Sequence, residues 1–185
     1  QESQHRNTLI LDFIHELFEA RSVEDTALLT FQTITDLGLE GSLIVQGQTR
    51  TIEIDTAGKV SPKNKILINN MQPYEIEAPQ NDTKITAKLS HLGAKLDISN
   101  KELSPEPIKR LALDILKMSD RALDKIKQSD ITNQQFKSMN ELSNTTKVIT
   151  HEMDVILENL LQRSQSNIDE GFPPTQNITR QQGLG

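Results

Sequence analysis

The sequence predicts an α+β fold, in which helices cover an antiparallel sheet and a helical, coiled-coil extension follows. Apolar residues recur at helical spacing up to residue 37, alternate with polar residues in short segments between residues 42 and 99, and return to helical spacing after residue 104. The connections between these segments are short, as in α+β domains. The chain of 185 residues can form one domain of usual size and an appendage.

Two amphipathic helices are expected first. The polar residues 1–7 are expected to be a frayed lead-in, and the following segment "TLILDFIHELFEA" carries a wide apolar face. In the second helix, Ser22 is the expected N-cap and Gly38 the expected C-terminal cap. The apolar face expected for the second helix consists of Ala27, Leu28, Phe31, Ile34 and Thr35.

Two strands and a short helix are expected next. Residues 42–55 predict two strands joined by a tight turn at Gly47 and Gln48. Ser61 followed by Pro62 predicts the start of a third helix. The apolar patch expected on this third helix consists of Ile66, Leu67 and Met71.

Three further segments are typical of strands. Residues 73–79 are bounded by prolines, which favours an edge strand. Residues 83–90 and 92–99 alternate strictly and are joined at Ser90 and His91, which predicts a hairpin. The inward-facing residues expected in this hairpin are Ile85, Ala87, Leu89, Leu92, Ala94, Leu96 and Ile98.

A long helical region is expected after the strands. Ser104 is its expected N-cap, with a proline at the first helical position. A break is expected near residues 127–133, where Ser129 or Asp130 would cap a new helix. The segment 169–185, with its Gly, Pro and Gln residues, is expected to be a disordered tail.

The composition argues against several classes of function. The formal net charge is −6 and no run of Lys or Arg exceeds two residues, which argues against nucleic acids and anionic membranes as partners. No apolar run approaches the ~18 residues of a membrane-spanning helix. The absence of cysteine excludes thiol catalysis and thiolate metal sites, and it fits a cytoplasmic location. Because the chain begins at Gln1 without a signal peptide, we expect it to be part of a longer protein.

Much of the chain resembles a family of sensory domains. The stretch "LILDFIHELFEARSVEDTALLTFQTITDLGLEGSLIVQ" resembles the opening of a GAF domain, with two helices and a strand after a Gly-containing turn. "SPKNKILINNM", the strands ending in "LDIS", and "LSPEPIKRLALDILKMSDRALDKI" are similar to the compact GAF-like version behind receiver domains in some bacterial response regulators. The resemblance assigns residues 8–128 to a GAF-like domain. It implies a bacterial signalling module, usually dimeric, that is not itself an enzyme.

The sequence departs from ligand-binding members of that family. The loops that often enclose a ligand in larger GAF domains are short here, and the cyclic-nucleotide sites of the family match no particular residues. Covalent bilin attachment would require a cysteine, and the chain has none. A bound small ligand remains an alternative. The preferred interpretation is a domain that packs and dimerises, without cofactor or metal.

Residues 129–168 predict a helical dimerisation segment. Apolar residues are spaced alternately three and four apart for about three heptads, and Val148, Val155, Leu157 and Leu161 widen the apolar surface toward a bundle. Such a helix must bury its apolar face against a partner, so a homodimer is the expected state. The seam, meaning the residues at the a and d heptad positions, consists of Met139, Leu142, Thr146, Ile149, Met153, Ile156 and Leu160.

His151 is a candidate for phosphotransfer chemistry. The register of the seam places it at the outer heptad position f, and "ITHEMDVILENL" resembles the histidine-box helix of dimerisation and phosphotransfer domains. This resemblance implies His151 as phospho-acceptor, with Glu152 assisting. The family usually continues with a basic residue, then Thr or Asn, then Pro, where this chain has Met153, Asp154 and Val155. A solvated histidine on a dimerising helix is therefore the preferred interpretation.

Other catalytic signals are weak. His15 and Glu19 lie four residues apart on the first helix, but two ligands do not make a metal site. The sequence has no phosphate-binding glycine loop and no nucleophile elbow. The preferred function is a non-catalytic signalling module that dimerises through C-terminal helices and relays an upstream or ligand signal. One alternative is a phosphotransfer or pseudo-histidine-kinase protein acting through His151, with a receiver domain or kinase as partner. Another is an assembly scaffold without a ligand.

Overall fold

The computed structural model describes residues 2–171, with side chains described for residues 4–169. The chain divides into two units, residues 1–132 and 133–185. The last helix, α4, contributes its first part to unit 1 and its remainder to unit 2. In chain order the elements are α1 (Glu2–Glu19), α2 (Val23–Asp36), β1 (Leu39–Gln46), β2 (Thr51–Asp55), α3 (Pro62–Asn70), β3 (Ile76–Glu77), β4 (Lys84–Lys88), β5 (Leu92–Ile98) and α4 (Pro105–Gly171).

Unit 1 is built on one five-stranded antiparallel sheet with the order β2-β1-β5-β4-β3. Its central pair joins β1 to β5, in a register that runs from Leu39 opposite Ile98 to Val45 opposite Leu92. β3 lies at one edge, as the prolines around it predicted. The α+β class and the antiparallel sheet are therefore confirmed.

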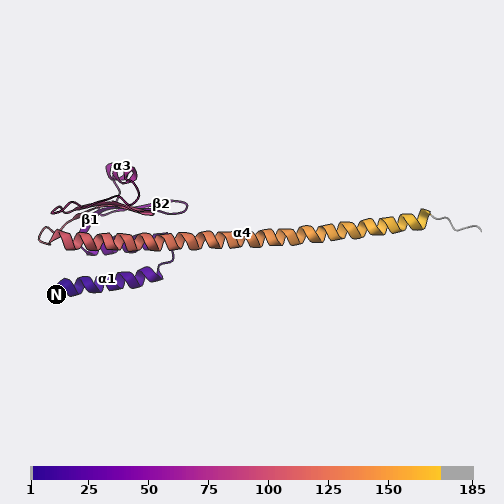
Figure 1. The fold of residues 1–185 in the computed structure, drawn as a ribbon, viewed down its shortest axis with the longest axis horizontal. Coiled ribbons are helices and arrows are strands. Elements are labelled where there is room, and N and C mark those ends of the chain that lie inside the picture. The colour runs from indigo at the N-terminus through magenta and orange to yellow at the C-terminus, as the bar shows by residue number, and fades with distance from the viewer. Residues whose placement is uncertain (1, 172–185) are drawn as a thin grey trace, which may run out of the picture. The chain divides into compact units, whose positions relative to one another are not determined.

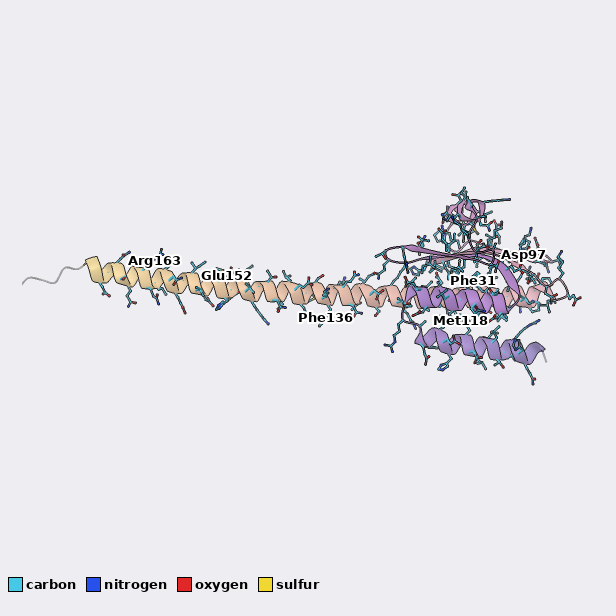
Figure 2. All side chains as sticks on the ribbon, turned by 180° about the vertical axis from the view of Figure 1, so that it is seen from behind. Phe31, Asp97, Met118, Phe136, Glu152 and Arg163 are labelled. Atoms are coloured by element: carbon cyan, nitrogen blue, oxygen red, sulfur yellow. The ribbon has the colours of Figure 1, made fainter. Side chains whose placement is uncertain are left out.

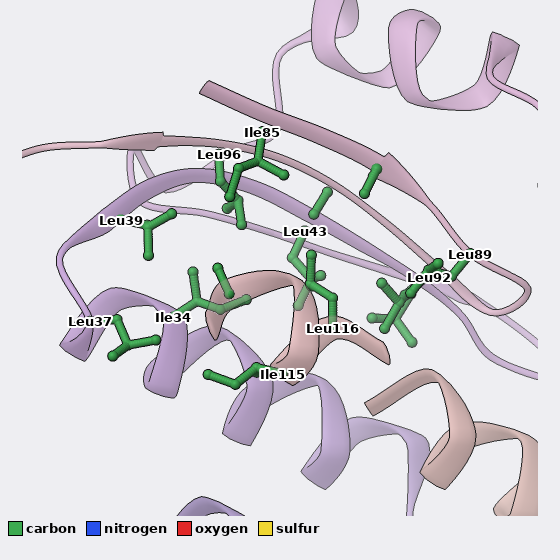
Figure 3. Close-up of a cluster of buried hydrophobic side chains, with 14 of the residues drawn as sticks. Ile34, Leu37, Leu39, Leu43, Ile85, Leu89, Leu92, Leu96, Ile115 and Leu116 are labelled. Carbon is green, nitrogen blue, oxygen red and sulfur yellow. The ribbon is translucent and has the colours of Figure 1, made fainter. Parts of the chain in front are cut away.

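Helices cover both faces of the sheet (Figure 1). α2 and the first part of α4 pack against one face, α1 packs on α2, and α3 lies over the opposite face (Figure 1). Figure 3 shows the main core, where Ile34 of α2 and Leu116 of α4 approach Leu43 and Leu96 of the sheet. All seven inward-facing residues predicted for the hairpin are buried, so their burial is confirmed. Thr86, which alternation places on the opposite face, is buried as well.

The buried face of α2 differs from the prediction. Leu28 is 60% exposed, whereas Thr26, Thr30 and Thr33 are buried. The hydroxyls of Thr30 and Thr33 donate to the carbonyl oxygens four residues earlier, at 2.6 and 2.8 Å. Because these hydroxyls are satisfied inside the helix, the threonines can be buried at little cost.

The N-caps predicted at Ser22 and Ser61 are confirmed. The Ser22 hydroxyl accepts from the amide of Asp25 at 3.0 Å, and the Ser61 hydroxyl accepts from the amide of Asn64 at 3.2 Å. Gly38 follows α2 with a φ of 85°, a left-handed conformation that glycine adopts without a steric penalty.

α3 covers the opposite face of the sheet, but the residues that it turns toward the sheet differ from those predicted. Ile66 and Leu67 are exposed, and Ile68, only 1% exposed, supplies the main contact together with Met71. Ile68 lies directly over Gly93 of β5, where a Cβ atom would be 2.3 Å from the Ile68 Cγ2. The missing side chain at position 93 therefore lets α3 approach the sheet closely.

Three predicted helix boundaries are wrong. α1 begins at Glu2, so residues 2–7 are helical rather than a frayed lead-in. α4 continues to Gly171 without the break expected near residues 127–133, and it includes residues 169–171 of the expected tail. Serine and aspartate reduce helix propensity but do not break a helix as proline does, and the Thr132 hydroxyl returns to the Gln128 carbonyl at 2.9 Å. The rest of the expected tail, residues 172–185, lies outside the described residues.

Candidate functional site

The predicted seam is exposed along the part of α4 that belongs to unit 2. Its six large apolar residues, all of the seam except Thr146, are between 51% and 68% exposed. Every side chain described from residue 131 to residue 169 is exposed. Figure 2 shows side chains of this stretch, among them Phe136, Glu152 and Arg163, projecting from the helix. The seam thus forms an apolar stripe on a regular helix.

The polar member of the seam does not oppose burial. The Thr146 hydroxyl donates to the Leu142 carbonyl at 2.9 Å. Thr145 and Thr150, which flank the stripe at heptad positions g and e, make the same bond to Glu141 and Thr146. These hydroxyl hydrogens are bonded within the helix. A partner that covers the stripe would therefore leave none of them without an acceptor.

His151 lies on the exposed surface of α4, and its helical neighbours differ from those considered in the sequence. Glu152 is adjacent in sequence, so its side chain leaves the helix about 100° away from the imidazole. The charged residues that share the face of His151 are Lys147, four residues before it, and Asp154, three residues after it. His151 is therefore exposed beside one basic and one acidic residue.

A polar cluster that the sequence did not predict joins the β4–β5 turn to α4 within unit 1. The His91 Nε2 lies 3.0 Å from Asp124 Oδ1, and the His91 Nδ1 lies 3.1 Å from Lys127 Nζ. The His91 backbone amide donates to Asp120 Oδ1 at 2.7 Å. About one turn beyond Lys127 on α4, Asp130 accepts a hydrogen bond at 3.2 Å from the side-chain amide of Gln48, which lies in the β1–β2 loop. Only tertiary folding brings these residues together, because His91 is 29–36 residues from its partners.

A buried lysine anchors the start of α4. Lys109 is only 2% exposed, and its ammonium donates to Glu106 Oε1 at 2.8 Å and to the Pro79 carbonyl at 2.5 Å. The hydrogen bond from Lys109 and then the one from the Asn81 amide lower the pKa of Glu106 below its ordinary value. These bonds hold the loop before β4 on the first turn of α4.

A second ion pair fixes the β1–β2 loop to α2. The Arg50 Nη2 lies 3.0 Å from Glu24 Oε1. A backbone hydrogen bond at Glu24, followed by the hydrogen bond from Arg50, lowers the pKa of Glu24. Both acidic residues with lowered pKa values therefore act as connectors between elements.

The sheet face under α3 carries a polar network beside the contact of Ile68. Asn64 of α3 donates to the Ser42 hydroxyl at 2.9 Å and accepts from Lys95 Nζ at 3.1 Å. Ser42 in turn donates to Asp55. Side chains of α3 thus fill the space against the sheet. A shallow hollow at the start of α3 is lined by Lys59, Val60, Ser61, Pro62 and Lys65.

The described residues hold no grouping of three or more His, Asp or Glu side chains able to bind a metal ion. His15 and Glu19 lie 3.9 Å apart as an exposed pair on α1. A search of the described helices for one long and apolar enough to cross a membrane finds none. Comparison with protein-family models, curated proteins and solved structures finds no match to the chain.

Proposed function

We propose that the protein is a non-catalytic bacterial signalling module, in which a GAF-like domain of residues 8–128 dimerises through the seam of α4. The order of helices and strands in unit 1 supports the GAF-like assignment. The exposed seam supports dimerisation. The proposed mechanism is a change in the packing of the paired helices when an upstream receiver domain or a ligand changes state.

The exposure of the seam is the observation that carries the proposal. Full burial of a large aliphatic side chain stabilises by about 1.5–3 kcal/mol, and these side chains are roughly half exposed. Six such residues from each of two helices can together offset an association cost of about 4–15 kcal/mol. The seam is thus sufficient in principle to hold a dimer.

α4 is suited to relay a signal because it belongs to both units. Ile115 and Leu116 are fully buried in the core of unit 1, and the seam residues follow on the same unbroken helix. A helix without a proline or glycine between these two sets has no built-in kink to absorb a displacement. In the proposed dimer, a change at the core would therefore alter the packing of the seam.

The test compares two double variants by light scattering at micromolar concentration. Ile149→Glu with Ile156→Glu places charges in the seam, whereas Asn140→Glu with Asn144→Glu places them at heptad positions b and f, on exposed polar residues outside the apolar surface. We expect the unmodified chain and the Asn140/Asn144 variant to be dimers and the Ile149/Ile156 variant to be a monomer. A monomeric unmodified chain contradicts the proposal, and so does dissociation of both variants alike.

Phosphotransfer through His151 is the second candidate, supported by the exposed imidazole on the outer face of the helix. The protein would be incubated with a phosphorylated receiver domain or a histidine kinase and assayed for acid-labile phosphate. Label that disappears in His151→Gln supports this candidate. Absence of both phosphate transfer and ligand binding, in a chain that still assembles, supports a scaffold instead.

A further inference from the structure

Two side-chain contacts of the His91 ring favour one tautomer. Lys127 offers only donors, so its ammonium can bond the His91 Nδ1 at 3.1 Å only if that nitrogen carries a lone pair. The ring proton must then lie on Nε2, where it donates to the Asp124 carboxylate at 3.0 Å. The geometry therefore describes a neutral imidazole held between one cation and one anion.

We propose that His91 is a proton-operated latch between the β4–β5 turn and α4. The neutral ring holds Lys127, and the protonated ring releases it. A protonated imidazole has a hydrogen on both nitrogens, so neither ring orientation offers an acceptor to the ammonium. The two like charges also repel each other at this distance.

The other groups around the ring decide how much of the contact opens. Asp124 continues to attract the protonated ring, and Asp120 still accepts from the His91 backbone amide. From the sheet, the backbone N–H of Gln46 donates to the backbone carbonyl of His91, which keeps the β4–β5 turn in place. On the neighbouring β1–β2 loop, the charge of Arg50 is paired with Glu24. Protonation therefore releases Lys127 while the Asp120 and Asp124 contacts remain.

The position of Lys127 gives the latch its effect. Lys127 is the last of the three His91 partners along α4, five residues before Thr132, where unit 1 ends. Its release removes one of the two side-chain bonds that hold the final turn of α4 inside unit 1, where Gln48 still donates to Asp130, and it leaves the preceding turns anchored. The latch itself does not depend on dimerisation. Only its use as a proton input to the helical relay rests on the proposed function.

The experiment uses a nitroxide on the chain of residues 1–185. The chain contains no cysteine, so Ser129→Cys, at an exposed position two residues after Lys127, gives a single labelling site. Lys117→Cys, exposed on an earlier turn of α4, is the control site. Between about pH 8 and pH 5, where imidazoles titrate, we expect the mobile spectral component to rise at least about twofold at position 129. At position 117 we expect no change.

Two variants separate the latch from a general acid effect. His91→Asn keeps an acceptor near the Nδ1 position but does not titrate, so the label should stay immobile at both pH values. Lys127→Met removes the ammonium, so the label should be mobile at both. A pH response that persists in His91→Asn overturns the proposal, and so does its absence from the otherwise unmodified chain.

A measurement without any variant keeps the proposal testable if the variants fold poorly. Imidazole ¹⁵N spectra of the unmodified chain at pH 8 should show the His91 proton on Nε2 and none on Nδ1. A proton on Nδ1 at that pH would overturn the latch. A monomer would give the same spectra and the same label response, so failure of the dimer test does not contradict the latch. Failure of the latch test likewise does not contradict the proposed dimer.

Discussion

The contact between Ile68 and Gly93 governs how closely α3 lies on the sheet. Gly93 pairs with Ile44 and Lys88 in the middle of the sheet, and its backbone is not in the left-handed region. An alanine at this position is therefore opposed by the neighbouring side chain and not by backbone strain. The Ile68 Cγ2 would have to move, and with it the α3 helix.

We predict that Gly93→Ala destabilises the protein by about 1–3 kcal/mol, the usual cost of overpacking a core. Chemical denaturation followed by circular dichroism measures this change. Removing the obstructing atoms with Ile68→Ala should abolish most of the cost of Gly93→Ala in the double variant. If the two substitutions are simply additive, the proposed steric conflict is not the cause.

The His91 cluster shows what single-residue reasoning could not supply. The sequence placed His91 correctly at the connection of a hairpin, because alternation on both sides marks the turn. It gave no sign of Lys127 or Asp124 as partners, since these residues have the spacing of any solvated helix face. The approach of the turn to α4 depends on the whole core and has no local signature.

At the scale of elements, strands were easier to predict than helix faces. In β4 and β5 every apolar residue that the pattern assigns to the inner face is buried, although Thr86 and Gly93 on the other face are buried too. In α2, counting apolar residues selected Leu28 over Thr30. The structure reverses that choice because Thr30 meets Ser119 of α4 at 2.6 Å, a partner 89 residues away.

We predict that Ser119→Ala destabilises unit 1 by about 1 kcal/mol. The Thr30 hydroxyl already donates to Thr26, so Ser119 must donate to Thr30, and the substitution removes that bond without stranding a donor. Ser129→Ala, at an exposed serine of the same helix, should change stability by less than about 0.5 kcal/mol. Equal effects in the two denaturation curves would show that the bond between α2 and α4 contributes nothing.

At the scale of the whole molecule, stability should depend on protein concentration. A dimer held by the seam binds its partner only in the folded state, so mass action raises the melting temperature as concentration rises. We expect this dependence for the unmodified chain over a hundredfold dilution series. Ile149→Glu with Ile156→Glu should remove it. A melting temperature independent of concentration in the unmodified chain would contradict dimerisation through the seam.

The region of the seam shows which features of a helix the sequence predicts and which it does not. The helix predicted for the seam residues is present in α4, because the seven-residue spacing of a regular helix needs no help from the rest of the fold. The expected break upstream was wrong, since Ser129 and Asp130 remain within the helix. A capping residue marks a helix start only where the preceding turn has already ended.

The central β1–β5 pair also sets an order of events during synthesis. Residues 39–45 cannot find their partners on β5 until residues 92–98 have been made, and the core then needs α4 as far as Leu123. Such distant pairing closes late. At about 5–20 residues per second, the ribosome adds the stretch from Leu123 to Leu160 in roughly 2–7 s. A nascent chain therefore has time to complete its sheet before it exposes the surface for which we propose dimerisation.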